Sequence, residues 1–581
     1  MKKAIIFLGA WVLAVSAGAA EWTEPETPML EAPSAPGFHG RAAPLERVTG
    51  KDAAGDEGCR VHRVAAWRNE RVNAQYVVWS DRAVGQMRLE VTDFASASGA
   101  RIPAAAARAR FVRYTRAGLR TKAGTWTVPE RLVGDCLDDG PAVDLPANGY
   151  RPVWLTVAVP KDAAPGTYEG TLAVVGADGA RQTFVLVIDV RRETLPDPRD
   201  WAFFLDLWQH PWAVARMAGV TPFTQAHYDA MRPLLRELAS AGQKTITTTL
   251  VDLPWNHQNY DAYHSMVVHL RQPDGSFRRD YALFDAYVAF ARSCGLGPQI
   301  HCYTMASWGN VVYYTDAATG TRVKVKLPAG TPEHEAFWGP FLEDFQAHLK
   351  EKGWLGDVYV ALDERSREEL MATVACVRRH APALKIQMAG NKPPSTFAGI
   401  EIHNYSQAML PGHITPAFVE EAKARRARGL VTTSYICCAP NVPNTFTTSS
   451  LAEARWLALY ARARGLDGML RWSAFNWPED PLRDSSYGGW RPGDTYLLYP
   501  GARASTRWEA LRDSIEIFEK MRVLGGASPA FAEQLARLLA EIDDAKLGKT
   551  SPAAYAAFTE RVEALIDAFS TPAPASEKAG R

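Results

Sequence analysis

Two adjacent carboxylates, Asp363 and Glu364, follow an apolar run that extends from Val358 to Leu362. A buried strand that ends in two acids places them at its C-terminal end, where ligands and catalytic groups lie in α/β architectures. Because two carboxylates this close do not both ionise freely, the pKa of one is raised toward a value that suits general acid catalysis. Taken alone, however, the pair is better explained by Asp363 capping the next helix and Glu364 being solvated in its first turn.

Aromatic and amide side chains are expected at the same end of the fold, just past the other predicted strands. Aromatic rings cover the apolar face of a pyranose, while amides bond its hydroxyls. A phosphate site would need a glycine-rich turn or a basic cluster, and neither is found there. Each residue alone has an equally good structural explanation, so their convergence is what indicates a neutral sugar ligand. The residues predicted to bind substrate are Trp255, Tyr303, Trp308, Asn391, Tyr405, Tyr435, Trp472, Asn476 and Trp477.

Consecutive acids suit one kind of glycosidase better than another. In ordinary retaining hydrolysis the two carboxylates lie about 5–5.5 Å apart, and they usually come from different strands. In the substrate-assisted variant the 2-acetamido oxygen of the sugar attacks the anomeric carbon, so the protein supplies no nucleophile. Asp363 would then hold the acetamido N–H and stabilise positive charge. Glu364 would protonate the leaving oxygen and afterwards deprotonate water.

Two alternatives stay open at this level. A two-carboxylate glycosidase would pair Glu364 with a distant acid, such as Asp206, Asp252 or Glu401, and would act on sugars without an acetamido group. A catalytically silent carbohydrate-binding protein would bind sugar without turnover, and the substitution Glu364→Gln would leave that binding unchanged.

Residues 21–195 predict a β-sandwich domain, because apolar and polar residues alternate in short runs separated by turn signals. A Pro-rich linker at residues 195–200 then ends this pattern. Residues 501–570 predict C-terminal helices at 508–524, 529–546 and 552–569. The Pro/Ala/Ser-rich tail at 571–581 predicts disorder.

Between residues 201 and 500, apolar runs alternate with amphipathic helices, which predicts a catalytic (β/α)8 barrel of the TIM type. The strands are expected at 203–207, 245–250, 299–303, 358–362, 385–389, 400–403, 430–435 and 468–472. Helices are expected at 225–240, 281–294, 333–352, 367–379, 417–428 and 452–464. The connection between the fifth and sixth strands is too short for a full helix. Hairpin-like insertions near 273–275 and across 311–327 are expected to shape the substrate pocket.

The N-terminus predicts export to the periplasm or out of the cell. Lys2 and Lys3 precede an apolar stretch and a small-residue segment, the pattern of a signal peptide over residues 1–20. No later run of about 18 apolar residues predicts a membrane span. A formal net charge of +1 gives no electrostatic support for a nucleic-acid partner. The sequence does not indicate an oligomeric state.

The 7 cysteines form no recognisable disulfide framework. Cys59 and Cys136 lie in the same region and are able to pair. No metal-ligand spacing such as CxxC or HExxH is found, so neither a metal nor an organic cofactor is expected. Four other cysteines are expected to be small buried hydrophobes in or beside core elements: Cys302, Cys376, Cys437 and Cys438.

The C-terminal half of the chain resembles glycoside hydrolase family 123, whose members include β-N-acetylgalactosaminidases. Besides the Asp363-Glu364 pair, the motifs that carry the resemblance are Tyr435-Ile436-Cys437-Cys438, Pro443-Asn444-Thr445-Phe446, Leu470-Arg471-Trp472, Asn476-Trp477, Asp480-Pro481, the block 494–501, Ser505, Arg507 and 508–513.

The resemblance extends over residues 201–524 and, more weakly, over the sandwich. It implies a sandwich followed by a catalytic barrel, and an exo-acting β-N-acetylhexosaminidase that favours the galacto configuration. Two positions depart from the family pattern and bear on substrate specificity. Arg365 stands where proline is expected, and His403 stands where an aromatic residue is expected.

Overall fold

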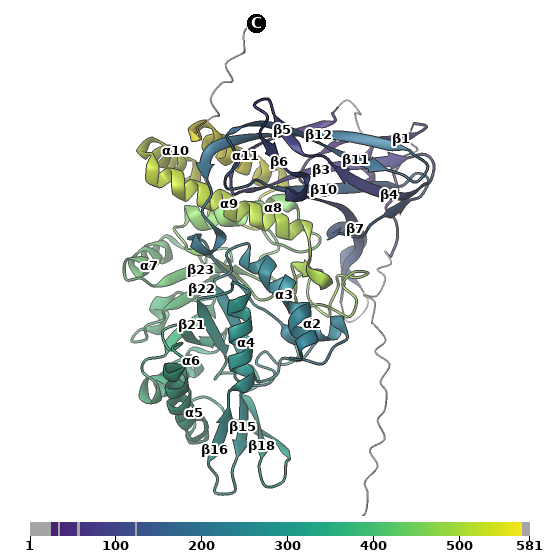
Figure 1. The fold of residues 1–581 in the computed structure, drawn as a ribbon. Coiled ribbons are helices and arrows are strands. Elements are labelled where there is room, and N and C mark those ends of the chain that lie inside the picture. Colours follow the sequence, from purple (N-terminus) through teal and green to yellow (C-terminus); the bar gives the residue numbers. More distant parts are fainter. Residues whose placement is uncertain (1–24, 33–34, 55–58, 122–124, 572–581) are drawn as a thin grey trace, which may run out of the picture.

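The computed structural model describes residues 25–32, 35–54, 59–121 and 125–571. These residues form an N-terminal β-sandwich, a barrel of parallel strands surrounded by helices, and a group of C-terminal helices beside the sandwich (Figure 1). The fold class predicted from the sequence is therefore confirmed. The predicted signal peptide, and residues 572–581 of the predicted tail, lie outside the described residues. In the described part, no helix is long and apolar enough to cross a membrane.

Two β-sheets form the sandwich. In the described residues, one sheet has the order β1 (Phe38–Ala43), β3 (Arg71–Ser80), β10 (Tyr150–Ala158), β7 (Ala107–Arg120) and β8 (Trp126–Asp138). The other has the order β2 (Val61–Arg68), β12 (Arg181–Thr194), β11 (Gly166–Val175), β4 (Val84–Val91) and β9 (Val143–Leu145), while β5 (Phe94–Ser96) pairs with β11 and with β6 (Arg101–Ile102). Buried side chains of both sheets fill the space between them, and the rings of Tyr76 and Phe184 stack with centroids 4.7 Å apart.

The barrel strands are parallel and follow the order β13-β24-β23-β22-β21-β20-β17-β14. Their bounds are β13 (Phe204–Leu207), β14 (Thr245–Thr249), β17 (Gln299–Tyr303), β20 (Val358–Leu362), β21 (Lys385–Gly390), β22 (Asn404–Ala408), β23 (Val431–Ile436) and β24 (Gly468–Arg471). The helices that surround them are α2 (Pro211–Ala218), α3 (Gln225–Ala239), α4 (Ala282–Ser293), α5 (Pro332–Glu351), α6 (Arg367–His380), α7 (Pro416–Ala427) and α8 (Leu451–Ala463). As expected, the connection from β21 to β22 holds only a 3₁₀ turn, Pro394–Phe397.

The barrel is closed between β13 and β14 mainly by side chains. An isolated backbone bridge joins Leu205 of β13 to Gln243, two residues before β14. The Gln243 amide accepts from the Leu207 N–H at 3.1 Å and donates back to the Leu207 carbonyl at 3.1 Å. The Gln209 amide accepts from the Thr247 N–H at 2.8 Å. These two glutamines form what we call the glutamine seam, in which amide groups replace part of a backbone ladder.

The sixth strand was predicted four residues too early. The sequence favours 400–403 because Ile400 and Ile402 are apolar, whereas the strand is β22, Asn404–Ala408, whose residues are mostly polar and all buried. Two of them find partners on other barrel strands: Asn404 Nδ2 donates to Gln299 at 2.9 Å, and the Ser406 and Thr433 hydroxyls lie 2.6 Å apart. Hydrophobicity alone therefore does not locate this strand.

The two predicted insertions join into one small sheet. β15 (Val268–Arg271) and β16 (Phe277–Asp280) form one hairpin, and β18 (Val311–Asp316) and β19 (Arg322–Lys326) form the other. The hairpins meet through parallel pairing of β15 with β18, and the sheet projects from the barrel end that carries the loops after β14 and β17 (Figure 1). The insertions were predicted as separate decorations, and their association depends on pairing that the sequence pattern does not encode.

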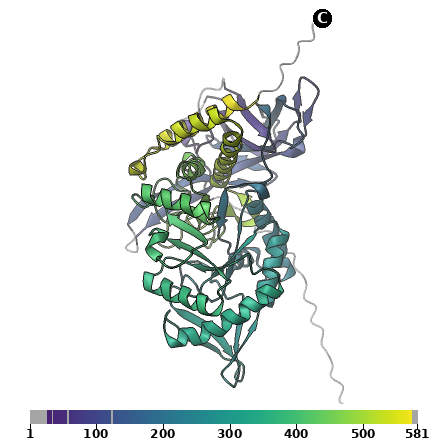
Figure 2. The same cartoon turned by 90° about the vertical axis from the view of Figure 1, so that its left-hand side faces the viewer.

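The C-terminal helices connect the sandwich to the barrel. They are α9 (Thr506–Ala527), α10 (Pro529–Leu539) and α11 (Pro552–Phe569), so the second helix is shorter than predicted. Figure 2 shows them against the sandwich and above the barrel helices. One apolar cluster extends through all three parts, from Trp154 of the sandwich through Trp201 to Phe531 of α10.

A buried arginine at the start of α9 joins the three parts by polar contacts. Arg507 binds both carboxylate oxygens of Asp135 on β8, at 3.0 Å through Nε and 2.9 Å through Nη2. Its Nη1 donates to the carbonyls of Thr445, Gly493 and Tyr496, at 2.7, 3.0 and 2.8 Å. Those carbonyls belong to the loops after β23 and β24, so Arg507 fixes two barrel loops against the sandwich.

Candidate active site

The predicted acids lie directly after β20, at the C-terminal end of the barrel strands. Asp363 is buried, and its Oδ2 accepts a hydrogen bond of 3.1 Å from the Trp308 indole N–H. Glu364 is exposed, and its Oε1 accepts a hydrogen bond from the Tyr435 hydroxyl of β23. Burial, and then the charge of Glu364, raise the pKa of Tyr435, so its phenol stays protonated and able to donate.

The two acids differ in their electrostatic surroundings. Burial is the largest cause, and repulsion from Glu364 the next, of a raised pKa of about 6 for Asp363. The hydrogen bond from Trp308 favours the ionised form and opposes this rise. The sequence predicted that one carboxyl of the pair would have a raised pKa, and the structure assigns that shift to the buried first member.

Both acids line one cavity of about 210 Å³. Its lining residues are Trp208, Trp255, Gln258, Trp308, Asp363, Glu364, Ala389, Tyr435, Cys437, Cys438, Leu470, Trp472 and Trp490. The walls are mainly indole rings, and the charged groups are the two adjacent acids. A larger cavity of about 500 Å³ lies between the sandwich and the C-terminal helices and contains neither acid. The smaller cavity is therefore the candidate active site.

The indoles form two walls that are held in different ways. The rings of Trp208 and Trp255 stack with centroids 4.8 Å apart, and Tyr303 supports both from below at 4.6 and 5.0 Å. The rings of Trp472 and Trp490 meet at 64° with centroids 5.3 Å apart. Aromatic faces at two angles suit the apolar face of a sugar ring together with a neighbouring substituent.

A buried ion pair orients Trp472. Arg471, at the end of β24, donates to the side chain of Asp494 at 3.1 Å, and Asp494 accepts from the Trp472 indole N–H at 3.2 Å. Arg471 also donates to Asn444 at 3.1 Å. All these polar groups except the indole are fully buried, so their fixed geometry determines the angle of the Trp472 ring.

Arg365, one of the two departures from the family pattern, supports the loop that carries Trp308. Its guanidinium pairs with Glu369 at 2.6 Å and donates to the Trp308 carbonyl at 3.3 Å. Glu369 also accepts from Asn310 of the same loop, at 3.0 Å. The side chain at position 365 therefore acts on the site through the Trp308 loop.

Several predicted substrate-binding residues do not reach the cavity. Tyr303 is buried beneath Trp208 and Trp255, and Tyr405 is buried on β22 with its hydroxyl bonded to the Lys392 carbonyl. Asn476 donates to Asn259, and the buried Trp477 indole donates to the Leu498 carbonyl at 2.7 Å. These four side chains are already packed or bonded within the protein.

Two further predicted positions lie outside the cavity. Asn391 is exposed and lines a separate hollow, of about 120 Å³, on the other side of Glu364. His403 precedes β22, so it lies at the opposite, N-terminal end of the strands, where its Nδ1 accepts from the Ile386 N–H at 3.2 Å. This departure from the family pattern therefore lies away from the cavity, at the other end of the barrel strands.

Five lining residues that carry functional groups or large rings are not among the predicted substrate-binding residues: Trp208, Gln258, Cys437, Cys438 and Trp490. Trp208 follows β13 directly, so the strand-end signal was present in the sequence. Trp490 lies far beyond the end of β24, and the sequence has no pattern that indicates its return to the cavity. Its indole N–H donates to the Gln258 carbonyl at 3.2 Å, across two loops.

The expectation of buried cysteines is confirmed for some positions and wrong for others. Cys302 and Cys376 are buried, whereas Cys437 is half-buried and Cys438 is exposed. The latter two follow the end of β23 rather than lying within a core element. Cys59 and Cys136 do not pair: both are free thiols, the first exposed and the second buried.

The distant acids considered as partners of Glu364 lie elsewhere. Asp206 is buried on β13, where it accepts from Thr245, and Asp252 pairs with His264 at 3.0 Å and with Arg322 at 2.5 Å. Glu401 pairs with Arg428 near the N-terminal end of β22. None of these three acids lines the cavity.

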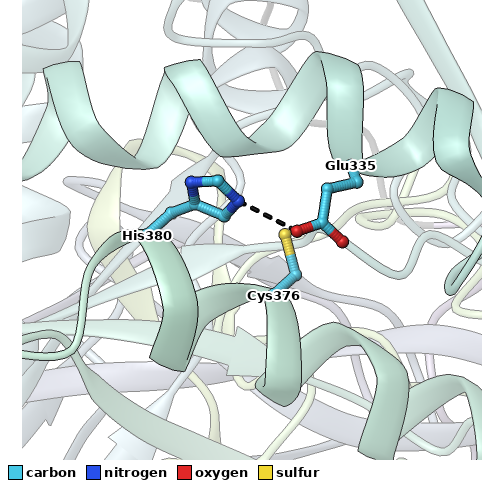
Figure 3. Close-up of side chains that lie close together, drawn as sticks. All are labelled: Glu335, Cys376 and His380. Atoms are coloured by element: carbon cyan, nitrogen blue, oxygen red, sulfur yellow. Dashed lines mark hydrogen bonds and ion pairs between the residues drawn. The ribbon is translucent and has the colours of Figure 1, made fainter.

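In the described part of the chain, one group of side chains has ligand atoms close enough to hold a metal ion. Glu335 of α5 faces Cys376 and His380 of α6, and their ligand atoms all lie within 4.8 Å of one another (Figure 3). However, His380 already bonds Glu335 at 2.9 Å and Glu343 at 2.7 Å, and Arg379 also binds Glu335. Burial raises the pKa of Cys376 to about 11, which keeps the thiol protonated. The group acts as an ion-paired contact between two outer helices, away from the cavity.

The comparisons with known proteins identify the family. The catalytic domain of glycoside hydrolase 123 matches residues 208–524, and the N-terminal domain of glycoside hydrolase 123 matches residues 50–176. A Clostridium perfringens family 123 glycoside hydrolase, described in terms of glycolipid glycan hydrolysis, is similar in structure with a TM-score of 0.84 and 25% identity. The match covers 92% of this chain and 98% of that chain.

A family 39 glycoside hydrolase from Bacteroides cellulosilyticus WH2 is a more remote match. Its TM-score is 0.35 at 14% identity, over 78% of this chain and 81% of that chain. No curated protein matches the sequence.

Proposed function

Because the chain belongs to glycoside hydrolase family 123, we propose that this glycosidase is an exported, exo-acting β-N-acetylhexosaminidase that favours N-acetylgalactosamine. The work on glycolipid glycans with the Clostridium perfringens relative supports a glycan or glycoconjugate substrate. The predicted signal peptide supports export. The cavity of about 210 Å³ is smaller than the roughly 300–1,000 Å³ usual for ligand pockets, which supports the binding of one terminal sugar ring.

The observation that carries the mechanism is that the carboxylates on the cavity are consecutive residues, Asp363 and Glu364. The candidates for a more distant partner, Asp206, Asp252 and Glu401, lie outside it. This arrangement supports a reaction in which the 2-acetamido oxygen of the sugar acts as the nucleophile. Holding that oxygen beside the anomeric carbon makes the attack intramolecular.

The different surroundings of the two acids support different roles. Asp363 is buried beside Trp308, so its carboxylate is positioned to accept the acetamido N–H and to stabilise the positive charge of the cyclic intermediate. Glu364 is exposed and bonded to Tyr435, so it is able to give a proton to the leaving oxygen and then take one from water. In this scheme Asp363 acts when ionised.

The test is hydrolysis of 4-nitrophenyl N-acetyl-β-D-galactosaminide, with the gluco isomer and the 2-hydroxy galactoside as comparison substrates. We expect turnover of the acetamido sugars only. The substitution Glu364→Gln should lower kcat by about 10²–10⁴-fold, the usual contribution of a general acid. The loss should be smaller with a 2,4-dinitrophenyl leaving group, because that group departs without protonation.

Two results would contradict this assignment. Equal hydrolysis of the 2-hydroxy galactoside would indicate a two-carboxylate mechanism. Sugar binding without turnover, unchanged by Glu364→Gln, would indicate a binding protein that has lost catalysis.

A further inference from the structure

Adjacent thiols lie on the wall of the candidate active site. Cys437 and Cys438 follow β23 and line the cavity, with their Sγ atoms 3.7 Å apart. Cys438 is exposed and Cys437 is half-buried. A disulfide bond has an S–S length of about 2.05 Å, so the two sulfurs must approach further before they bond. Because consecutive Cα atoms are about 3.8 Å apart, closer than in most disulfides, the bond between these two residues would be strained and readily reduced.

The backbone of this pair is held firmly on one side. The Cys437 carbonyl accepts from Asn444 Nδ2 at 2.9 Å, and the Cys437 N–H donates to the Ala439 carbonyl at 3.1 Å. Asn444 is itself fixed, because its N–H donates to Glu453 at 2.8 Å and its side-chain oxygen accepts from Arg471 at 3.1 Å. Cys437 therefore keeps its place, and the exposed Cys438 is the side chain free to move.

The two thiols differ in acidity in a way that suits stepwise exchange. The hydrogen bond from Cys437 is the main cause of a lowered pKa for Cys438, and the same interaction raises the pKa of Cys437. The charges that face Cys438, from Asp494 and Glu364, oppose its ionisation. Exposure and the neighbouring donor together make Cys438 the attacking sulfur.

We propose that Cys437 and Cys438 are a dithiol–disulfide modification site on the wall of the sugar cavity, oxidised by low-molecular-weight disulfides. The Cys438 thiolate attacks one sulfur of the reagent and releases its first thiol. The Cys437 thiol then loses its proton, its sulfur attacks the Cys438 sulfur, and the second thiol departs. The protein loses two protons and two electrons, and the reagent takes them up and is reduced to two thiols.

The bonded form changes the wall on which the sugar rests. It replaces an ionisable thiol near Glu364 by a neutral, apolar group with fixed geometry, on a wall otherwise formed by indoles. An apolar, rigid surface suits the apolar face of a pyranose better than a wall with a mobile thiol. In the part that concerns sugar affinity, the inference rests on the function proposed above.

The experiment equilibrates the folded full chain with oxidised or reduced glutathione and maps the thiols by alkylation and peptide mass. We expect the peptide with residues 437 and 438 to lose two hydrogen masses in the oxidised sample. We also expect KM to fall about threefold, the factor obtained when one side chain no longer has to be immobilised on binding. Cys438→Ser should abolish both effects, while Cys59→Ser, at an exposed isolated thiol, should preserve both.

Two results would overturn the inference: both thiols staying open to alkylation in oxidised glutathione, or the bond forming without a change in KM. The mass measurement needs no sugar, so it separates this inference from the proposed function. If no sugar is turned over in either state, the proposed function fails. The effect on the site is then measured as backbone amide hydrogen exchange of the segment that contains Tyr435. Slower exchange in the oxidised protein supports the inference, and unchanged exchange overturns it.

Discussion

At the residue scale, the central feature is a buried acid beside an exposed one. Asp363 has a raised pKa of about 6 because it is buried, and Trp308 limits that rise. If Asp363 acts as the ionised partner of the acetamido group, activity should be lost as the pH falls through this value. The acid limb of the pH profile then reports the state of Asp363.

The first prediction concerns Trp308→Phe, which keeps an aromatic ring but removes the N–H that stabilises the Asp363 carboxylate. The pKa of Asp363 should rise further, so the acid limb of kcat/KM should move to higher pH. A pH series with the 4-nitrophenyl acetamido sugar measures this. Trp490→Phe is the matched control, because its indole N–H donates to a carbonyl and not to an acid. An acid limb at the same pH in Trp308→Phe and the wild type would contradict the prediction.

The second prediction is that Asp363→Asn stabilises the protein at neutral pH. The folded-state pKa is raised above that of an unfolded aspartate, so the stability linked to this group is present at low pH and lost as the pH rises through about 6. With about 1.36 kcal/mol per pKa unit, the gain should be on the order of 2–3 kcal/mol at pH 8 and absent at pH 4. Thermal unfolding at both pH values tests this. A gain of the same size at both would argue against the electrostatic cause.

At the element scale, the bounds of some barrel strands could be predicted from the sequence, whereas the position of the mostly polar strand β22 could not. The run that ends at Leu362 is apolar, the run that ends at Tyr303 alternates polar and apolar residues, and β17 and β20 begin and end where predicted. β22 could not be placed because its buried residues are mostly polar, and the contacts of Asn404 with Gln299 and of Ser406 with Thr433 are invisible in one sequence. Tyr405 was consequently assigned to a strand end although it is buried within β22, with its hydroxyl bonded to the Lys392 carbonyl.

The path of the long loops also could not be predicted from the sequence, and this limited the prediction of the site. Trp255, Trp308 and Trp472 lie close behind strands and reach the cavity as predicted. Trp490 reaches it only because the loop after β24 folds back, and that loop is fixed by Arg507 at Gly493 and Tyr496. Contacts between such distant segments have no local signature.

The third prediction concerns the buried pair formed by Arg507 and Asp135. Arg507→Met should destabilise the fold by about 3–5 kcal/mol, because it leaves a buried carboxylate without its main partner. Arg537→Met removes an exposed pair with Glu533 on α10 and should change stability by less than about 1 kcal/mol. Thermal unfolding compares the two variants with the wild type. Equal effects would show that burial of the first pair has no energetic consequence.

At the scale of the whole molecule, the sandwich supports a loop of the candidate active site. Strand β7 pairs with the loop after β24, because the Arg116 N–H donates to the Arg483 carbonyl at 2.9 Å and the Ser485 N–H donates to the Arg116 carbonyl at 2.9 Å. The same loop continues to Trp490 on the cavity wall. The sandwich therefore supports an active-site loop from a distance, which explains why the two parts are packed together through buried polar contacts.

Buried acids also gather where the sandwich meets the C-terminal helices. Asp513 and Glu516 of α9 line the large cavity there, opposite Glu70 of the sandwich. Burial is the main cause of a raised pKa in all three, to about 7 for Glu516. Asp513 accepts a hydrogen bond of 2.9 Å from Asn73 of β3, which an uncharged residue could accept equally well.

The fourth prediction follows from these shifts. Acids with a raised folded-state pKa stabilise the fold at low pH, and this contribution is lost as the pH rises from about 4 through 7. Because burial also raises the pKa of Asp513, Asp513→Asn should flatten the fall in thermal stability as the pH rises above about 4, the range in which an unfolded aspartate ionises. The exposed Glu533→Gln of α10 serves as control and should leave that slope unchanged. A slope in Asp513→Asn as steep as in the wild type would exclude this carboxyl as its source.

The glutamine seam makes closure of the barrel a property that point substitution can alter. Between the other strands, neighbours are joined by backbone groups that every residue carries, so no single exchange of side chains removes the connection. Between β13 and β14 much of the connection consists of hydrogen bonds made by the side chains of Gln209 and Gln243. The cylinder therefore has a defined line along which it can open into a curved sheet. A circular permutation with its new ends on this line should disturb the fewest backbone hydrogen bonds of the barrel. A force that pulls on the first strand should separate β13 from β14 before it separates other strand pairs.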